Sequence, residues 1–93
     1  FEGFAPEIVS VGAVYGHNGT LAAAALERGV RVVSDKPIAA NQAQWEKLQS
    51  LTGSGTGVLL TEFPFRAQAE FRAAREAVLA GKIGEVVLAS AQK

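Results

Sequence analysis

Residues 32–41 read VVSDKPIAAN, and this stretch places a small polar group directly behind an apolar run. Two valines open it, and an acid, a base and a proline follow as Asp35, Lys36 and Pro37. β-branched residues favour a strand, whereas proline lacks the backbone N–H needed for strand pairing and favours a turn. The pattern predicts a buried strand over residues 30–34 that delivers a carboxylate and an ammonium group to its end.

Strand and helix signals alternate along the rest of the chain. Short apolar runs predict strands, and alanine-rich or amphipathic segments closed by glycine predict helices. Helical crossovers join parallel strands, so the sequence predicts an α/β fold with parallel strand pairs. The expected order is β-α-β-α-β-α-β, with strands over residues 8–14, 30–34, 58–63 and 85–91 and helices over residues 21–28, 41–53 and 67–78.

The second predicted helix carries a start signal and an apolar face. Asn41 is a suitable N-cap, with Gln44 three residues later as its reciprocal partner. Trp45, Leu48 and Leu51 share one face of this helix, which predicts that Trp45 packs in the core.

Composition argues against several classes of protein. Nine basic and nine acidic residues cancel, so no field of one sign favours nucleic acid or an anionic membrane. The chain has no cysteine and one histidine, so we expect neither disulfides nor a metal site. No apolar run approaches the roughly 18 residues that span a bilayer, and no signal peptide is visible. The chain starts at Phe1 and has no methionine, so we expect a cytoplasmic domain cut from a longer protein.

Polar groups follow the first three predicted strands, at residues 15–18, 35–37 and 62–66. Ligands of open parallel sheets bind in the crevice outside the carboxyl ends of the strands. Strand ends also carry polar residues for purely structural reasons, so each group alone does not define a site. Together, the three groups predict a binding crevice at one edge of the sheet.

The residues around Asp-Lys-Pro resemble the Gfo/Idh/MocA family of NAD(P)-dependent oxidoreductases. In that family an alanine-rich helix of the form AAALEAGKHV precedes a strand that ends in Glu-Lys-Pro. This chain has AAALERGVRV at residues 23–32 and Asp-Lys-Pro at residues 35–37. Further on, the family's arginine, helix and Gly-x-Ile-Gly-Glu are matched by Arg66 and by GKIGE at residues 81–85. The resemblance covers residues 7–93.

The resemblance implies the C-terminal half of a Rossmann-type sheet, with a last strand that enters an α+β substrate domain. Residues 1–66 would be a partial dinucleotide-binding domain, and residues 67–93 the start of a substrate and oligomerisation domain. The implied activity is hydride transfer between NAD or NADP and a sugar, polyol or related hydroxy or keto compound, in a homo-oligomer. No Gly-x-Gly-x-x-Gly follows an early strand, so we expect the isolated chain to be inactive.

The resemblance assigns Lys36 as the catalytic residue, reaching towards the reacting hydroxyl and the nicotinamide. Asp35 replaces the family's glutamate at a contact to the nicotinamide ribose, and Pro37 matches a proline that often follows a cis peptide bond. A partly desolvated lysine could polarise the hydroxyl or share in its proton transfer. The alternative is a solvated surface lysine beside Asp35.

The first loop departs from the family pattern. Ala13-Val14-Tyr15 stands at a Thr-Pro-Asn-like position, and Asn18 falls near a family histidine, with His17 one place away. Ala13, Tyr15, His17 and Asn18 are therefore candidate cofactor contacts. Equally, His17 could be an exposed loop residue, and Tyr15 could pack on its neighbours.

Arg66 is the last candidate, as a pocket-wall residue that binds cofactor or pairs with Asp35. Its alternative role is an ion pair with Glu70, four residues along the same segment. Arg72 and Arg75 are expected on a solvated helix face.

Two other functions stay open. One is a non-catalytic ligand-binding or sensor protein of the same fold, for which Asp35 and the altered first loop leave room. The other is an unrelated α/β domain, such as a response-regulator-like module. The Ile-Gly-Glu segment and the lack of paired early acids argue against the latter.

Overall fold

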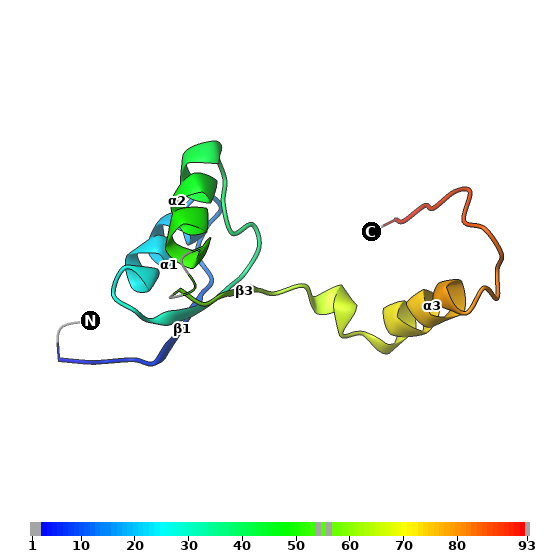
Figure 1. Cartoon of the computed structure of the whole chain (residues 1–93), viewed down its shortest axis with the longest axis horizontal. Coiled ribbons are helices and arrows are strands. Elements are labelled where there is room, and N and C mark those ends of the chain that lie inside the picture. Colours follow the sequence, from blue (N-terminus) through cyan, green and yellow to red (C-terminus); the bar gives the residue numbers. More distant parts are fainter. Residues whose placement is uncertain (1–2, 54, 56, 93) are drawn as a thin grey trace. The chain divides into compact units, whose positions relative to one another are not determined.

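The computed structural model describes residues 3–53, 55 and 57–92, in two compact units, Phe1–Glu62 and Phe63–Lys93. Ser54 and Thr56, in the predicted helix-to-strand connection, lie outside the described residues. Along the chain the elements are β1 (Ile8–Val11), α1 (Asn18–Leu26), β2 (Arg31–Ser34), α2 (Gln42–Gly53), β3 (Leu59–Thr61), a 3₁₀ turn (Pro64–Arg66) and α3 (Ala69–Leu79), as Figure 1 shows.

The first unit is a β-α-β-α-β arrangement around a three-stranded sheet. Strand β2 lies in the centre and pairs in parallel with β1 on one side and β3 on the other. The register aligns Val9 with Val32 and Val32 with Leu59. These pairings confirm the predicted α/β class with parallel strands.

Both crossover helices of this unit lie side by side (Figure 1). Crossovers between neighbouring parallel strands are right-handed, so two crossovers made in the same direction along the sheet place their helices on one face. The core forms between these helices and the face of the sheet on which Val32 lies. Its buried members are Val11, Ala22, Ala23, Ala25, Leu26, Val30, Val32 and Leu48.

The opposite face of the sheet is open within the described residues. Ile8 and Leu60 are each one residue removed from the register of Val32, so they lie on the opposite face of the sheet. They are 57% and 59% exposed. The sheet is thus covered on one face only within the described residues, because both helices lie on the same side. Trp45 is also exposed, at 42%, and its predicted place in the core is wrong. Leu48, one turn further along, supplies the buried contact of α2.

Helix α1 begins at Asn18, three residues earlier than predicted. It ends at a glycine: Gly29 has φ +74°, and its N–H donates to Leu26 O at 2.9 Å. The N–H of Val30 donates to Ala25 O at 3.1 Å. These two bonds form a Schellman motif, for which glycine suits the left-handed position, and they confirm the predicted helix end.

Helix α2 begins with the predicted cap, in a slightly shifted form. The Gln44 N–H donates to Asn41 Oδ1 at 2.9 Å. In return Gln44 Oε1 accepts from the N–H of Ala40 at 2.8 Å, one residue before the cap. Two of the donors near the helix start are satisfied in this way.

The second unit contains the 3₁₀ turn and α3, whose end carries Gly81 at φ +70°. The predicted strand over residues 85–91 is wrong, because this segment forms no strand in the structure. A strand needs a hydrogen-bonding neighbour, and none pairs with this segment among the described residues. No helix in the described ranges is long and apolar enough to cross a bilayer.

We expect the substitution Gly19→Ala to destabilise the protein. A Cβ at Gly19 would lie 2.8 Å from both Gln44 Oε1 and Ile38 O. The clash should cost about 1–3 kcal/mol and outweigh the gain of about 1 kcal/mol in helix propensity. Gly53→Ala is the matched control, since that helical glycine has open space around it. Urea unfolding should show this control unchanged or slightly stabilised, and equal stability of both variants would contradict the close packing.

The ion pair between the two helices should make stability depend on pH. Glu27 Oε1 lies 2.6 Å from Lys47 Nζ, and the hydrogen bond and charge of Lys47 lower the pKa of the Glu27 carboxyl. A lowered carboxyl pKa stabilises the fold above the unfolded pKa, and this contribution disappears as pH falls through the folded value. Thermal unfolding should therefore show Glu27→Gln less stable than wild type near neutral pH, and the difference should shrink as the pH falls into the acidic range in which the Glu27 carboxylate is protonated. Glu46→Gln, which removes no ion pair found among the described residues, should lack this pH dependence.

Candidate functional site

The carboxyl ends of the three strands meet at one edge of the first unit. The Asp35 N–H donates to Val11 O at 2.8 Å, and the Glu62 N–H donates to Ser34 O at 3.0 Å. The strand ladder therefore extends to the residue after each of the last two strands. It brings the beginnings of the second and third predicted polar groups to the edge where β1 ends at Val11.

Lys36 leaves this edge directly after Asp35. Its Nζ lies 3.7 Å from Asp35 Oδ1, and the two side chains are 55% and 52% exposed. The backbone N–H of Lys36 donates to the same carboxylate oxygen at 2.8 Å. The partial desolvation expected for a reactive lysine is thus not supplied by the described residues. The peptide bond between Lys36 and Pro37 is cis, as the resemblance implied.

Asn18 lies beneath the loops instead of on their surface. Its side chain is buried, and the residue is 1% exposed. The N–H of Ala13 donates to Asn18 Oδ1 at 2.8 Å, and Asn18 Nδ2 donates to Asp35 O at 3.2 Å and to Pro37 O at 3.3 Å. One side chain thus joins the loop after β1 to the loop after β2. A direct contact of Asn18 to a cofactor stays a prediction.

The other candidates of the first loop are open to solvent. Tyr15 is 77% exposed, and Ala13 and His17 are exposed as well. The His17 N–H donates to Val14 O at 3.1 Å, which closes the turn before α1. These residues border the strand edge, and their cofactor contacts stay predictions.

Gln44 is a residue of this edge that sequence reasoning assigned only to helix capping. Its Nε2 donates to Gly16 O at 2.7 Å and to Thr20 Oγ1 at 3.2 Å. The side chain therefore ties the first loop to the start of α2. The position of Gln44 three residues after Asn41 signals its capping role in the sequence. Its bond to Gly16 depends on tertiary packing, so no sequence signal indicates it.

Arg66 lies in the second unit. Its guanidinium carbon is 5.7 Å from the centroid of the Phe63 ring, and the alternative ion pair with Glu70 is not formed among the described residues. The predicted pairing of Arg66 with Asp35 stays a prediction.

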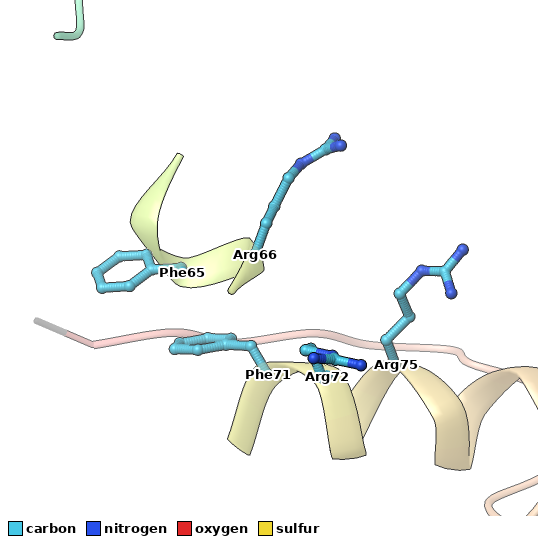
Figure 2. A pocket seen from close by; sticks show the side chains of 5 residues that line it. All are labelled: Phe65, Arg66, Phe71, Arg72 and Arg75. Atoms are coloured by element: carbon cyan, nitrogen blue, oxygen red, sulfur yellow. The ribbon is translucent and has the colours of Figure 1, made fainter. Parts of the chain in front are cut away.

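A hollow of the second unit, about 600 Å³, is lined by Phe65, Arg66, Phe71, Arg72 and Arg75 (Figure 2). The two phenyl rings stack with centroids 5.0 Å apart. Figure 2 shows the guanidinium groups of Arg66 and Arg75 extending to the same side of the turn and helix. Guanidinium groups in this arrangement can bind an anionic group. Arg72 and Arg75 were expected on a solvated face, and their spacing of three residues places them on one side of α3.

A hollow of about 440 Å³ in the first unit lies beside Pro37, and Trp45 and residues 37–42 line it. The exposed ring of Trp45 thus forms a wall next to the Asp-Lys-Pro turn. No group of three or more His, Cys, Asp or Glu side chains that could hold a metal ion occurs in the described part of the chain.

A parallel sheet with polar loops at the carboxyl ends of its strands places the chain in the class of open α/β folds that bind their ligands at that edge. The sequence profile of a family described as an oxidoreductase family with an NAD-binding Rossmann fold matches residues 2–63. The chain belongs to this family, the Gfo/Idh/MocA oxidoreductases. The family expected from the residues around Asp-Lys-Pro is thereby confirmed.

Solved structures show the same fold. A myo-inositol 2-dehydrogenase from Lactobacillus plantarum superposes with a TM-score of 0.85 at 17% identity, over 92% of this chain and 26% of that one. An inositol dehydrogenase homolog from Azotobacter vinelandii, complexed with NADH and myo-inositol, gives 0.75 at 26% identity, over 85% and 21%. The chain therefore spans about a quarter of the length of these structures. No curated protein matches the sequence.

We expect the contact between Asp35 and Lys36 to contribute little to stability. Both side chains are about half exposed, and exposed ion pairs contribute about 0–1 kcal/mol. Asp35→Asn keeps an oxygen that can accept from the Lys36 N–H. The free energy of unfolding, measured in urea, should therefore change by less than about 1 kcal/mol. A loss above about 2 kcal/mol would show that the carboxylate has a structural role that its exposure does not indicate.

Proposed function

We propose that the chain is part of an NAD(P)-dependent dehydrogenase that transfers hydride between a nicotinamide cofactor and a sugar, polyol or related hydroxy or keto compound. The main support is the position of Lys36, which leaves the carboxyl edge of the sheet directly after Asp35, inside the segment that matches the family. The relative solved with NADH and myo-inositol supports a polyol as the substrate class.

The residues at this edge fit the nicotinamide half of such a cofactor. Asp35 offers a half-exposed carboxylate, which can accept hydrogen bonds from ribose hydroxyls. Open space surrounds Gly12 and Gly16, so the backbone of the first loop is accessible to a ligand. No glycine-rich turn of the kind that cradles a pyrophosphate is present in the sequence, so the fit does not extend to that half.

The bound nicotinamide would supply the hydride acceptor or donor. Lys36 would donate a hydrogen bond to the substrate hydroxyl, stabilise the negative charge that develops on its oxygen and share in moving its proton. Asp35 would orient the cofactor ribose. Tyr15 and His17 would border the nicotinamide, together with the backbone at Ala13, and Arg66 would bind a cofactor or substrate oxygen.

A longer protein is part of this proposal. Residues 1–66 would complete a dinucleotide-binding domain whose other half holds the pyrophosphate, and residues 67–93 would begin the substrate domain of a homo-oligomer. The exposed face of the sheet at Ile8 and Leu60 and the half-exposed Lys36 would be covered there. The isolated chain would then be inactive, and NAD(P)H oxidation by the purified 93-residue chain would contradict this part.

The decisive test compares Lys36→Ala with Lys82→Ala, an exposed lysine of the second unit, in the full-length protein. Turnover of a polyol panel should fall by about 10²-fold or more in Lys36→Ala, because a group that moves a proton contributes about 10²–10⁴-fold. Calorimetry should show NAD(P)H affinity within a few-fold of wild type. The control should change neither quantity.

Two results would oppose the proposal. Unchanged turnover in Lys36→Ala would make Lys36 a solvated strand-end residue. Tight cofactor binding with no turnover of any polyol by the wild-type protein would favour the non-catalytic sensor.

A further inference from the structure

The buried side-chain amide of Asn18 hydrogen-bonds to the backbone on both sides of Lys36. Asn18 Nδ2 donates to the carbonyl of Asp35 at 3.2 Å and to the carbonyl of Pro37 at 3.3 Å. These carbonyls belong to the residues directly before and after Lys36. The lysine backbone is therefore held at two points by a side chain from another element, the first residue of α1.

The same amide fixes the loop after β1. The N–H of Ala13 donates to Asn18 Oδ1 at 2.8 Å. An asparagine amide has two N–H donors and one carbonyl acceptor group, and here every one of them has a backbone partner. Because Asn18 is 1% exposed, moving either loop would leave a buried polar group without a partner, which is costly. The geometry of the turn around Lys36 is thus coupled to that of the first loop.

A second amide supports the first. Gln44 Nε2 donates to Gly16 O at 2.7 Å, and Gln44 Oε1 accepts from Ala40 N–H at 2.8 Å. It therefore links the loop after β1 to the segment that follows Pro37. Gly19 makes this approach possible, because the space of its missing Cβ is taken by Gln44 and Ile38.

We propose that Asn18 is a positioning residue for Lys36. Its amide sets the direction in which the lysine leaves the sheet edge and holds it against the loop after β1. Each of its polar atoms already has a backbone partner, so it acts on the site through the position of Lys36. This inference rests on the proposed function of Lys36 and adds the hydrogen bonds that orient this lysine. A misplacement of about 1 Å in a reacting group can cost about 10²-fold in rate.

The experiment uses the full-length protein with three variants. Asn18→Ala removes all three hydrogen bonds. Asn18→Asp keeps an oxygen that accepts from the Ala13 N–H. Its carboxylate has no N–H, so it cannot donate to the carbonyls of Asp35 and Pro37. Leu48→Ala is the matched control, because it truncates a core residue of 1% exposure that makes none of these bonds.

Four readouts are needed: kcat and KM on a polyol that the protein turns over, NAD(P)H affinity by calorimetry, thermal unfolding, and hydrogen exchange of the Ala13 amide. Asn18→Ala should lower kcat by about 10–100-fold, with cofactor affinity within about three-fold, and its Ala13 amide should exchange faster. Asn18→Asp should lower kcat as well but keep the Ala13 amide protected. Leu48→Ala should lower the unfolding temperature and leave kcat within about three-fold, measured well below unfolding.

Several results would overturn the inference. If Lys36→Ala loses turnover but both Asn18 variants keep kcat, the positioning role fails while the proposed function stands. If Lys36→Ala keeps turnover, the proposed catalytic role of Lys36 fails, and the positioning role of Asn18 fails with it. If both Asn18 variants fail to fold, or if Leu48→Ala loses as much kcat as they do, Asn18 is a structural residue only.

Discussion

The central position of β2 is the constraint on which the first unit depends. Its two parallel ladders, to β1 and β3, point all three strands in one direction and bring their carboxyl ends to one edge. The ladders continue past the strands, through the Asp35 and Glu62 amides. Lys36 therefore leaves the sheet from its middle strand, between the carboxyl ends of β1 and β3.

Small residues bring the helices close enough for this arrangement to work. Ala22 and Ala25 of α1 are 0% and 2% exposed, so the helix backbone packs directly on its neighbours. Gly19 lets α1 approach the start of α2. At that distance the short side chain of Asn18 reaches two backbone carbonyls, and Gln44 reaches the first loop. The alanine-rich character of α1 is thus a condition for the contacts at the candidate site.

The exposed parts of the structure follow from the same topology. Two crossovers of one hand cover one face of the sheet, and the other face keeps Leu60 at 59% exposure. Residues 85–91 remain without a strand partner in the described part of the chain. The hollow of the second unit presents three arginines beside two stacked phenyl rings. In solved structures of the same fold, this chain matches only about a quarter of the length.

By itself, the sequence determined the fold class, the order of the first six main elements, the glycine end of α1 and the family. These depend on local signals, namely β-branched runs, alanine-rich periodicity, caps and the Asp-Lys-Pro turn, and they act over a few residues. Tertiary structure alone decided three other matters: the buried role of Asn18, the exposure of Trp45 and the missing strand at residues 85–91. Each depends on a partner that is distant in sequence or missing from the described residues. A local pattern reports what a side chain can do, whereas burial and hydrogen bonding depend on what the fold places beside it.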